Sequence, residues 1–358
     1  MKPEMLKDLN ELAQYRQYLT RHPQLRYLFF ELTDRCNLAC LHCGSSCDQH
    51  NCHYLDLKDL RKVLLDVKEN FSVLPQICLT GGEPLLYPQL EEFLTMVNEM
   101  GFPWGMTSNG MLIDEKTAKM LIEQNIYSIS ISLDGLPEAH NHLRNSPLAY
   151  QKALEGINNL VRWGKGKTVI QITSVVSQLN INELDEIYRL AESLNVDSLR
   201  LINIEPMGRA LLYPQLLLQK ADYRKLFDFI AEKRSQKDAT MEVTYGCSHY
   251  LTDEYEGRLR DHYFLCAAGI YVASITAEGD IISCLDIERR PELIQGNIRN
   301  DKLSEVWYKR FSLFRQDHSK QSPRCRNCKE KQFCRGDSYH SYDFANHQPL
   351  LCMKDILE

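Results

Sequence analysis

The sequence predicts an α/β protein: a partial (β/α)6 barrel followed by a smaller, cysteine-rich α+β domain. Two observations support this fold class. From about residue 27 to about residue 235, short β-rich runs alternate with stretches that carry apolar residues at helical spacing. From Cys247 onward the pattern changes to short strands, turns and cysteines. Repeated strand–helix units form a parallel sheet, which can close partly into a barrel or remain open.

The 358 residues exceed one average domain and fall short of three. We expect an N-terminal helical cap over residues 1–26, a (β/α)6 domain over 27–240 and the cysteine-rich domain over 241–358. The predicted strands are 27–32, 76–80, 101–108, 127–133, 169–176 and 198–204. The predicted helices are 57–67, 90–100, 116–122, 149–161, 181–194 and 220–234. Ligand sites in such folds lie at the carboxyl ends of the strands.

The composition is that of an ordinary soluble protein, with 44% hydrophobic and 25% charged residues. No apolar run reaches the roughly 18 residues of a membrane span, and the first 20 residues show no apolar signal region, so we expect a cytoplasmic protein without a membrane partner. The net charge of −6, without a Lys/Arg block, argues against nucleic acid. Thirteen cysteines in a reducing compartment indicate metal ligation. Cys78, in an apolar run, reads as a buried apolar residue.

Three cysteines follow the first predicted strand directly. Cys36, Cys40 and Cys43 have C-x3-C-x2-C spacing in the segment TDRCNLACLHCGSSC. Three thiolates from one tight loop can ligate three irons of a cubane cluster and leave the fourth iron open. The alternative is a structural zinc site completed by Cys47 or Cys52. The position of the loop, at the carboxyl end of the first strand, favours the iron-sulfur cluster.

Further polar segments end the next strands. LTGGEP ends the second strand, TSNG the third and ISLDG the fourth, which HNHLR follows. Glycines let the backbone approach a ligand closely, and a carboxylate can receive an ammonium group. The alternative is that these glycines form a turn and that Asn109 and Asp134 are turn or helix-capping residues.

The cysteine triplet in this location resembles the defining motif of the radical S-adenosylmethionine (SAM) superfamily. The resemblance implies a [4Fe-4S] cluster whose free iron is chelated by the amino and carboxylate groups of SAM. Reductive cleavage of SAM would then give methionine and a 5′-deoxyadenosyl radical. An electron donor such as flavodoxin or ferredoxin is implied as a partner. The segment EPMGRA after the sixth strand resembles the loop that closes the SAM site in many relatives.

The same resemblance implies SAM contacts. His42 would pack near the adenine, and Arg144 would grip the SAM carboxylate. Ser174 is a weaker candidate for the ribose. The LTGGEP residues that would bind the SAM amino group are Gly81, Gly82, Glu83 and Pro84. The residues that would line the ribose and the polar edge of SAM are Ser108, Asn109, Ser132 and Asp134.

A second cysteine set begins at Cys266. It reads C-x12-G-x4-C over Cys266, Gly279 and Cys284, then C-x2-C-x5-C, and ends in a lone cysteine. This resembles the SPASM extension of peptide-maturing radical SAM enzymes. The resemblance covers about residues 27–354 and implies one or two auxiliary iron-sulfur clusters. The outer cluster would be held by Cys325, Cys328, Cys334 and Cys352.

The inner cluster would use Cys266, Cys284 and an upstream cysteine, for which Cys247 is the candidate. Its remaining ligand position is Ser338, where the SPASM pattern has a cysteine. Three outcomes stay open: a three-cysteine cluster with one iron free for substrate or for a non-cysteine ligand, a smaller cluster, or none. Candidate extra ligands are Asp337, His340 and His249. Zinc in this cysteine set is a further alternative.

The SPASM resemblance implies an enzyme that modifies a peptide or protein at an unactivated C–H bond, by a crosslink, an oxidation or an epimerisation. Maturation of ribosomally made peptides is the favoured interpretation, with Asp286 as a candidate general base. The 26 residues before the first strand are too few for a leader-recognition domain, so either a separate protein supplies that function or the barrel binds the peptide directly. The alternatives are an oxidoreductase for a small molecule, such as a sugar alcohol or a cofactor precursor, and a non-catalytic electron carrier or zinc-bearing binding protein.

Overall fold

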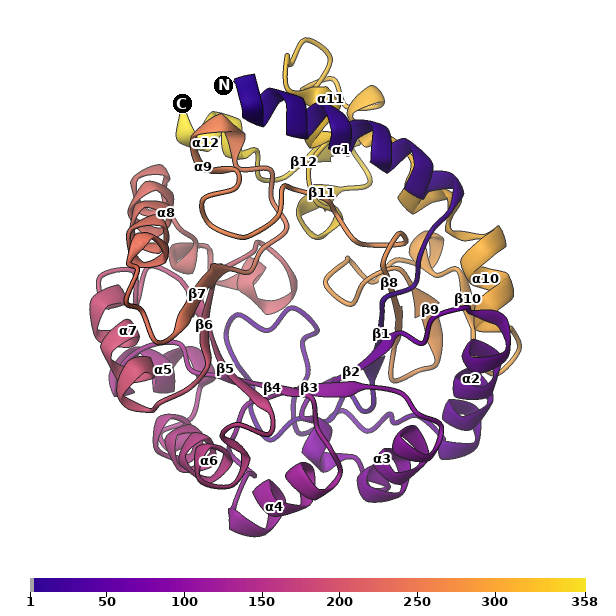
Figure 1. Cartoon of the computed structure of the whole chain (residues 1–358), viewed down its shortest axis with the longest axis vertical. Coiled ribbons are helices and arrows are strands. Elements are labelled where there is room, and N and C mark those ends of the chain that lie inside the picture. The colour runs from indigo at the N-terminus through magenta and orange to yellow at the C-terminus, as the bar shows by residue number, and fades with distance from the viewer. Residues whose placement is uncertain (1–2) are drawn as a thin grey trace.

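The computed structural model describes residues 3–358 and contains a curved sheet of ten strands, in the order β10-β9-β8-β1-β2-β3-β4-β5-β6-β7. The strands from β1 to β7 are parallel, and β8 adds to β1 on its other side, also parallel. β9 and β10 extend this edge in antiparallel pairs. Figure 1 shows the sheet curling around the middle of the molecule without closing. The strands are β1 Tyr27–Glu31, β2 Gln76–Thr80, β3 Trp104–Ser108, β4 Ser128–Ser132, β5 Val169–Val176, β6 Ser198–Asn203, β7 Glu242–Tyr245, β8 Val272–Ile275, β9 Asp280–Ile282 and β10 Gly296–Asn297.

Helices cover the outer, convex side of the sheet (Figure 1). Helix α2 shows why: its buried residues Leu60, Val63, Leu64 and Val67 recur at helical spacing on one face, and the Asp56 side chain caps its first turn by accepting from the Lys58 amide. The helices up to the end of the barrel are α1 Pro3–Arg21, α2 Leu57–Asn70, α3 Leu90–Glu99, α4 Glu115–Glu123, α5 Pro137–Arg144, α6 Ala149–Gly164, α7 Leu184–Ser193 and α8 Lys220–Ser235, with 3₁₀ turns η1 Pro84–Leu86, η2 Gly208–Leu212 and η3 Pro214–Leu216.

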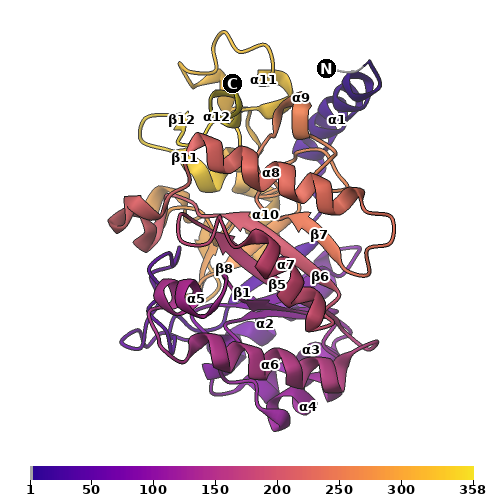
Figure 2. The same ribbon diagram turned by 90° about the vertical axis from the view of Figure 1, so that its left-hand side faces the viewer.

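The C-terminal part is built of short elements, and its last segment lies near α1 on the open side of the curved sheet (Figure 1, Figure 2). Its attachment to α1 includes a hydrogen bond that the Arg16 guanidinium donates to the Phe333 carbonyl. The elements are α9 Thr252–Tyr255, η4 Pro291–Leu293, α10 Leu303–Lys309, η5 Phe311–Arg315, η6 His318–Lys320, α11 Lys331–Cys334, η7 Tyr339–Ser341, β11 Tyr342–Asp343, β12 Gln348–Pro349 and α12 Met353–Leu357.

The predicted α/β class and partial barrel are confirmed, and the six predicted strands appear as β1 to β6. Helix α5 and strand β7 were not predicted. β7 pairs with β6 beyond residue 240, and β8 pairs with β1, so the sheet continues through the predicted boundary. Strands from both sides of residue 240 thus share one sheet, and the division into residues 1–26, 27–240 and 241–358 stays a prediction. Within residues 3–358, no helix is both long and apolar enough to cross a membrane.

The two faces of the sheet differ in polarity. In β4, Ile129 and Ile131 are buried in the main apolar core, whereas the alternate serines are only partly buried. On the serine side, the Ser130 and Thr173 hydroxyls lie 2.7 Å apart, and Gln171 donates to both. Because the helices cover the apolar face, the polar face lines the inside of the barrel.

Candidate iron-sulfur and cofactor sites

The predicted cysteine loop follows β1. Cys36 and Cys40 are buried, Cys43 is half-buried, and the three pack with Leu38 and Cys47 in a small cluster. Burial raises the pKa of Cys36 to about 12 and also raises that of Cys40. Thiolates at Cys36 and Cys40 therefore need a positive partner, which the irons of a cluster supply when bound, whereas a hydrogen bond from Cys47 lowers the pKa of Cys43 to about 6. The donor set fits such a cluster, and the three cysteines are brought together as predicted.

The LTGGEP segment lies directly against the cysteine loop. A Cβ atom on Gly81 would lie 2.2 Å from the Thr33 carbonyl oxygen, and one on Gly82 would lie 2.2 Å from that of Arg35. The Gly82 amide donates to Thr33 and the Glu83 amide to Arg35, at 2.8 and 2.9 Å. Only glycine permits this backbone approach. The two segments predicted to build the SAM site are thus joined through their main chains.

The Glu83 carboxyl group organises the ends of β2 and β3. It is fully buried and accepts from the Ser108 hydroxyl and the Asn109 amide, both at 2.8 Å, and from the Leu85 amide at 3.2 Å. Burial raises its pKa to about 7, although these hydrogen bonds lower it. Asn109 in turn donates to Asn37 Oδ1 at 2.7 Å and lies 3.9 Å from Cys36 Sγ. Glu83 therefore positions Ser108 and Asn109 beside the cysteine loop, and its SAM contact stays a prediction.

Asp134 and Arg144 form a buried ion pair. Arg144 Nε lies 2.6 Å from Asp134 Oδ2, and the Arg144 guanidinium also approaches Cys40 Sγ at 3.8 Å. Burial alone would raise the Asp134 pKa, but Arg144 and the neighbouring His42 lower it to about 2. His42 Nε2 lies 3.9 Å from the same carboxylate, and burial lowers the His42 pKa to about 4, so its ring is neutral at pH 7. The arrangement places a cation beside a cysteine that is predicted to hold iron.

The remaining predicted SAM residues differ in access. Ser132 ends β4 and is half-buried, so it can reach a ligand. Ser174 is fully buried, and its hydroxyl donates to the Leu133 carbonyl. Asp134 and Arg144 are each engaged by the other, so their predicted SAM contacts would be made in addition to that pair. Pro84 begins the turn η1.

The EPMGRA segment clamps the cysteine loop, through residues that the sequence reasoning did not single out. Arg209 donates from Nε to the Cys40 carbonyl at 2.8 Å and from Nη2 to the Cys47 carbonyl at 2.7 Å. Its amide donates to the Cys43 carbonyl at 3.0 Å. Gly208 has φ +52°, and a Cβ there would lie 2.3 Å from the Cys43 oxygen. In the sequence, the adjacent Gly208 and Arg209 after β6 were the feature that could have indicated this contact.

The outer cysteine set converges on one cavity of about 260 Å3. Cys334 ends α11, and Cys352 precedes α12. Burial raises the pKa values of Cys325, Cys334 and Cys352. Here too, the positive charge of a metal would be needed to stabilise the thiolate forms. The thiols that line the cavity are those of Cys325, Cys328, Cys334 and Cys352, the predicted set.

The inner set is brought together only in part. Burial raises the Cys266 pKa, while the Ser338 hydroxyl and the Tyr339 amide, which contact its sulfur, lower it. Burial and the nearby Asp286 carboxylate raise the pKa of the Cys284 thiol. Cys266 lies close enough to raise it further. Ser338 thus lies beside Cys266, and its place in an inner cluster stays a prediction. Cys247 follows β7, and its thiol donates to the carbonyl of Asn203, the last residue of β6, at 3.7 Å.

Asp286 is exposed, and its carboxylate lies 4.0 Å from the Cys284 sulfur. It therefore stands at the edge of the inner cysteine set, and its role as general base stays a prediction.

We expect replacement of Cys325 or Cys334 by alanine to remove about four irons per chain, because each side chain lines the four-thiol cavity. Iron content of the anaerobically reconstituted protein measures this. Cys52→Ala is the control, since that thiol is exposed and lies outside both sets. Unchanged iron content in Cys325→Ala and Cys334→Ala would show that these residues are not ligands.

Comparison with known proteins agrees with this geometry. Residues 30–191 match the radical SAM superfamily, and residues 266–329 match an iron-sulfur cluster-binding domain, SPASM. The AdoMet-dependent heme synthase of Nitratidesulfovibrio vulgaris is 24% identical, over 93% of both chains. The mycofactocin maturase MftC of Mycobacterium tuberculosis is 26% identical, over 86% of this chain and 77% of its own.

Two solved structures share the fold. Streptococcus suis SuiB bound to S-adenosylmethionine matches with a TM-score of 0.72 and 19% identity, over 95% of this chain and 80% of its own. The enzyme anSMEcpe with AdoMet and a peptide matches with a TM-score of 0.69 and 21% identity, over 90% of each chain. The radical SAM domain implies a [4Fe-4S] cluster and SAM, and the SPASM domain implies auxiliary iron-sulfur clusters. The chain therefore contains a radical SAM domain over residues 30–191 and a SPASM domain over residues 266–329.

Proposed function

We propose that this radical SAM enzyme modifies a peptide or protein substrate at an unactivated C–H bond, by a crosslink, an oxidation or an epimerisation. A ribosomally made precursor peptide is the favoured substrate, and the reaction is of the oxidoreductase type. SAM and the cluster of the N-terminal cysteines, when bound, supply the radical chemistry. The division of the chain into a cap, a barrel and a SPASM domain, and a cytoplasmic location, belong to the same proposal.

The observation that carries the proposal is a short chain of contacts between the two cysteine sets. Arg209 holds the cysteine loop, and Glu205, four residues earlier, contacts His249 and His340. His340 contacts Ser338, which contacts Cys266. A substrate in the barrel would therefore lie between the radical source and the auxiliary cluster, which suits a reaction that passes an electron from substrate to cluster.

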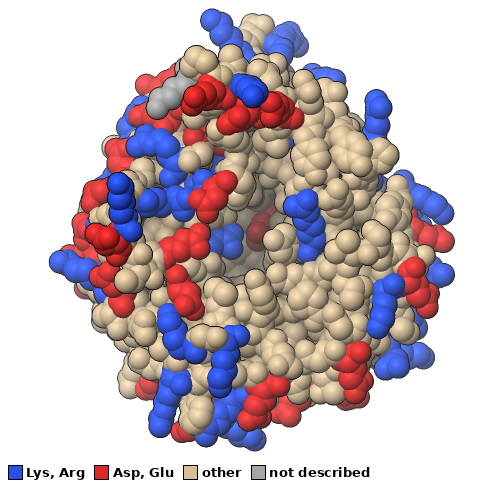
Figure 3. Space-filling view, in the orientation of Figure 1, with Lys and Arg blue, Asp and Glu red and all other residues tan. Residues whose placement is uncertain are grey.

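The surface and the inner wall also suit a polar chain molecule. The face of Figure 3 is hollowed near its middle, with acidic and basic side chains around the hollow. The inner face of β4 and β5 offers the hydroxyl and amide groups of Ser130, Gln171 and Thr173. Such donors and acceptors can bind and orient a peptide backbone. Support also comes from MftC, which is named a maturase, and from SuiB, which was solved with its precursor peptide.

A small-molecule substrate is the second candidate function. It is favoured by the AdoMet-dependent heme synthases, which match this chain over nearly their whole length. In this alternative, the polar inner wall would orient the polar groups of a tetrapyrrole or another cofactor precursor.

The test is an anaerobic assay of the cluster-reconstituted protein with SAM, dithionite, and short peptides encoded beside its gene. We expect 5′-deoxyadenosine to form and one peptide to change in mass, as read by mass spectrometry. Flavodoxin or ferredoxin is expected to replace dithionite, and a separately encoded leader-binding protein to raise the yield. A parallel assay replaces the peptides by a porphyrin. Unmodified peptides, together with a porphyrin that changes in mass, would decide for the second candidate.

A further inference from the structure

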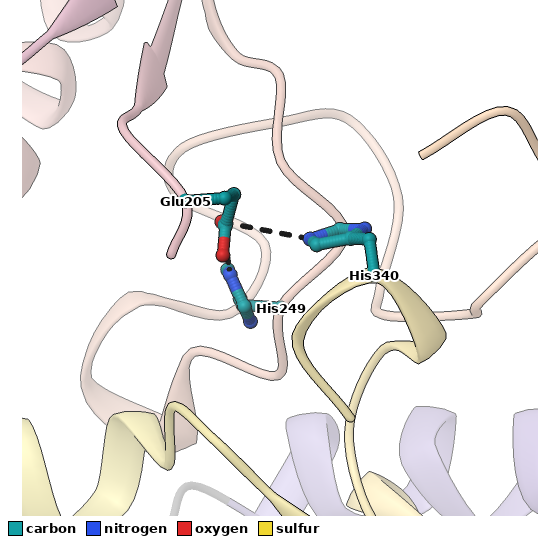
Figure 4. A group of neighbouring side chains, drawn as sticks. All are labelled: Glu205, His249 and His340. Carbon is teal, nitrogen blue, oxygen red and sulfur yellow. Dashed lines mark hydrogen bonds and ion pairs between the residues drawn. The ribbon is translucent and has the colours of Figure 1, made fainter. Parts of the chain in front are cut away.

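Three metal-binding side chains meet where the barrel joins the C-terminal part. Glu205 follows β6, His249 follows β7 and His340 lies in η7, and Figure 4 shows them turned toward one another. One ligand atom from each lies within 4.8 Å of the other two. His249 Nε2 is 2.7 Å and His340 Nε2 is 3.5 Å from Glu205 Oε1.

The cluster is buried but not satisfied by its own hydrogen bonds. The His249 side chain is 0% exposed, that of Glu205 11% and that of His340 13%. Oε2 of Glu205 and Nε2 of His340 are buried atoms without a hydrogen-bond partner among the described residues. Buried polar atoms are almost always satisfied in native proteins. If His249 were protonated, its two ring N–H groups would be paired with Glu205 and Asp337. Glu205 Oε2 and His340 Nε2 would still have no partner among the described residues.

The second ring nitrogens of both histidines are held by polar partners, and Asn203 also holds the Glu205 carboxylate. His249 Nδ1 lies 3.1 Å from Asp337 Oδ2, and His340 Nδ1 lies 2.7 Å from the Ser338 hydroxyl. The Asn203 side chain donates to Glu205 Oε1 at 2.8 Å. Metal-binding histidines typically bond their second nitrogen to a carboxylate or another polar group, which orients the ligating nitrogen. Both Nε2 atoms are held in this way and directed at Glu205.

We propose that Glu205, His249 and His340 bind one divalent transition-metal ion, zinc or ferrous iron, separate from the iron-sulfur clusters. Two imidazoles and a carboxylate suit such borderline ions. With bonds of about 2.1 Å, tetrahedral ligand atoms lie about 3.4 Å apart, so the His340 distance already fits and the His249 distance must open by about 0.7 Å. The unpartnered Glu205 Oε2 gives the carboxylate a second atom to offer. Three protein ligands leave a coordination position open for water or a substrate group.

The ion would link the two parts of the chain. Glu205 belongs to the segment whose Arg209 and Gly208 hold the cysteine loop, whereas His340 is two residues from Ser338 in the inner cysteine set. Metal binding would thus fix the loop after β6 in place against the SPASM domain. This inference does not depend on whether the substrate is a peptide.

The probe is Zn²⁺ itself, dialysed anaerobically against the cluster-loaded protein in zinc-buffered solution, with zinc and iron then measured by mass spectrometry. We expect about one zinc per chain in the wild type. Glu205→Gln, His249→Gln and His340→Gln should weaken binding by about 100-fold or more, and Asp337→Asn by about 10- to 100-fold, since loss of an outer partner alone has that effect. His262→Gln is the matched control, because its side chain is exposed and lies outside the cluster.

Other outcomes would overturn the proposal. If His340→Gln removes about four irons and leaves zinc binding unchanged, His340 is a ligand of the inner auxiliary cluster. Zinc binding that survives all three substitutions and is lost in Cys325→Ala would place the ion on the thiols. If the variants do not fold, zinc X-ray absorption of the wild type decides: nitrogen and oxygen ligands alone at about 2.0–2.2 Å support the site, and sulfur at about 2.3 Å, or no bound zinc, contradicts it. The metal content of the anaerobically isolated protein then distinguishes zinc from ferrous iron.

Discussion

Replacing Cys36, Cys40 and Cys43 together by alanine is expected to abolish 5′-deoxyadenosine formation and to leave the C-terminal iron in place. The three thiols belong to one loop after β1, and the outer four line a separate cavity, so the two sets should load independently. Iron per chain should fall by about four, the content of one cubane cluster. Mass spectrometry of deoxyadenosine and methionine, alongside iron analysis, measures both effects.

Cys78→Ala is the matched control for this experiment. That thiol lies in β2, and burial raises its pKa to about 12, but it belongs to neither cysteine set. Its loss should leave iron content and SAM cleavage close to those of the wild type. Retained deoxyadenosine formation in the triple variant would refute the assignment of the N-terminal cysteines.

Replacing Arg144 by methionine is expected to destabilise the protein by about 3–5 kcal/mol, because it leaves the Asp134 carboxylate buried without its cation. Asp134 is 0% exposed and keeps the Val175 amide, at 2.9 Å, as a donor to its carboxylate. Urea unfolding of the cluster-loaded protein under anaerobic conditions measures the loss. Arg189→Met is the control, because Arg189 pairs with Glu186 on the surface, where such pairs contribute at most about 1 kcal/mol.

The effect of Arg144→Met should depend on pH. In the folded wild type, the Asp134 pKa is about 2, below the ordinary value of about 3.9 for an unfolded chain. The stabilisation is therefore present above about pH 4 and is lost as the pH falls toward 2. The difference in unfolding free energy between wild type and variant should shrink on acidification. A difference that stays constant from pH 4 to pH 2, or an effect no larger than that of Arg189→Met, would contradict the role given to the pair.

The strands and the cysteine loops could be predicted because their signals are local. Short β-rich runs mark β1 to β6, and the structure begins and ends β2 and β5 at the predicted residues. The spacing of Cys36, Cys40 and Cys43 within one turn-rich loop already fixes their proximity. Helix α5 was missed because its sequence PEAHNHLR carries few apolar residues, and it forms where Leu143 packs into the core and Arg144 reaches Asp134.

The sequence by itself determined the fold class, the strands β1 to β6 and the two cysteine sets, since each rests on residues close together in the chain. Only the tertiary structure showed that Arg144 pairs with Asp134, that Arg209 clamps the cysteine loop and that Glu205 meets a histidine 44 residues away. Spacing in the sequence carries no information about such pairs. They form because parallel strands deliver their carboxyl ends to one edge of the sheet, and because the C-terminal part folds back over that edge.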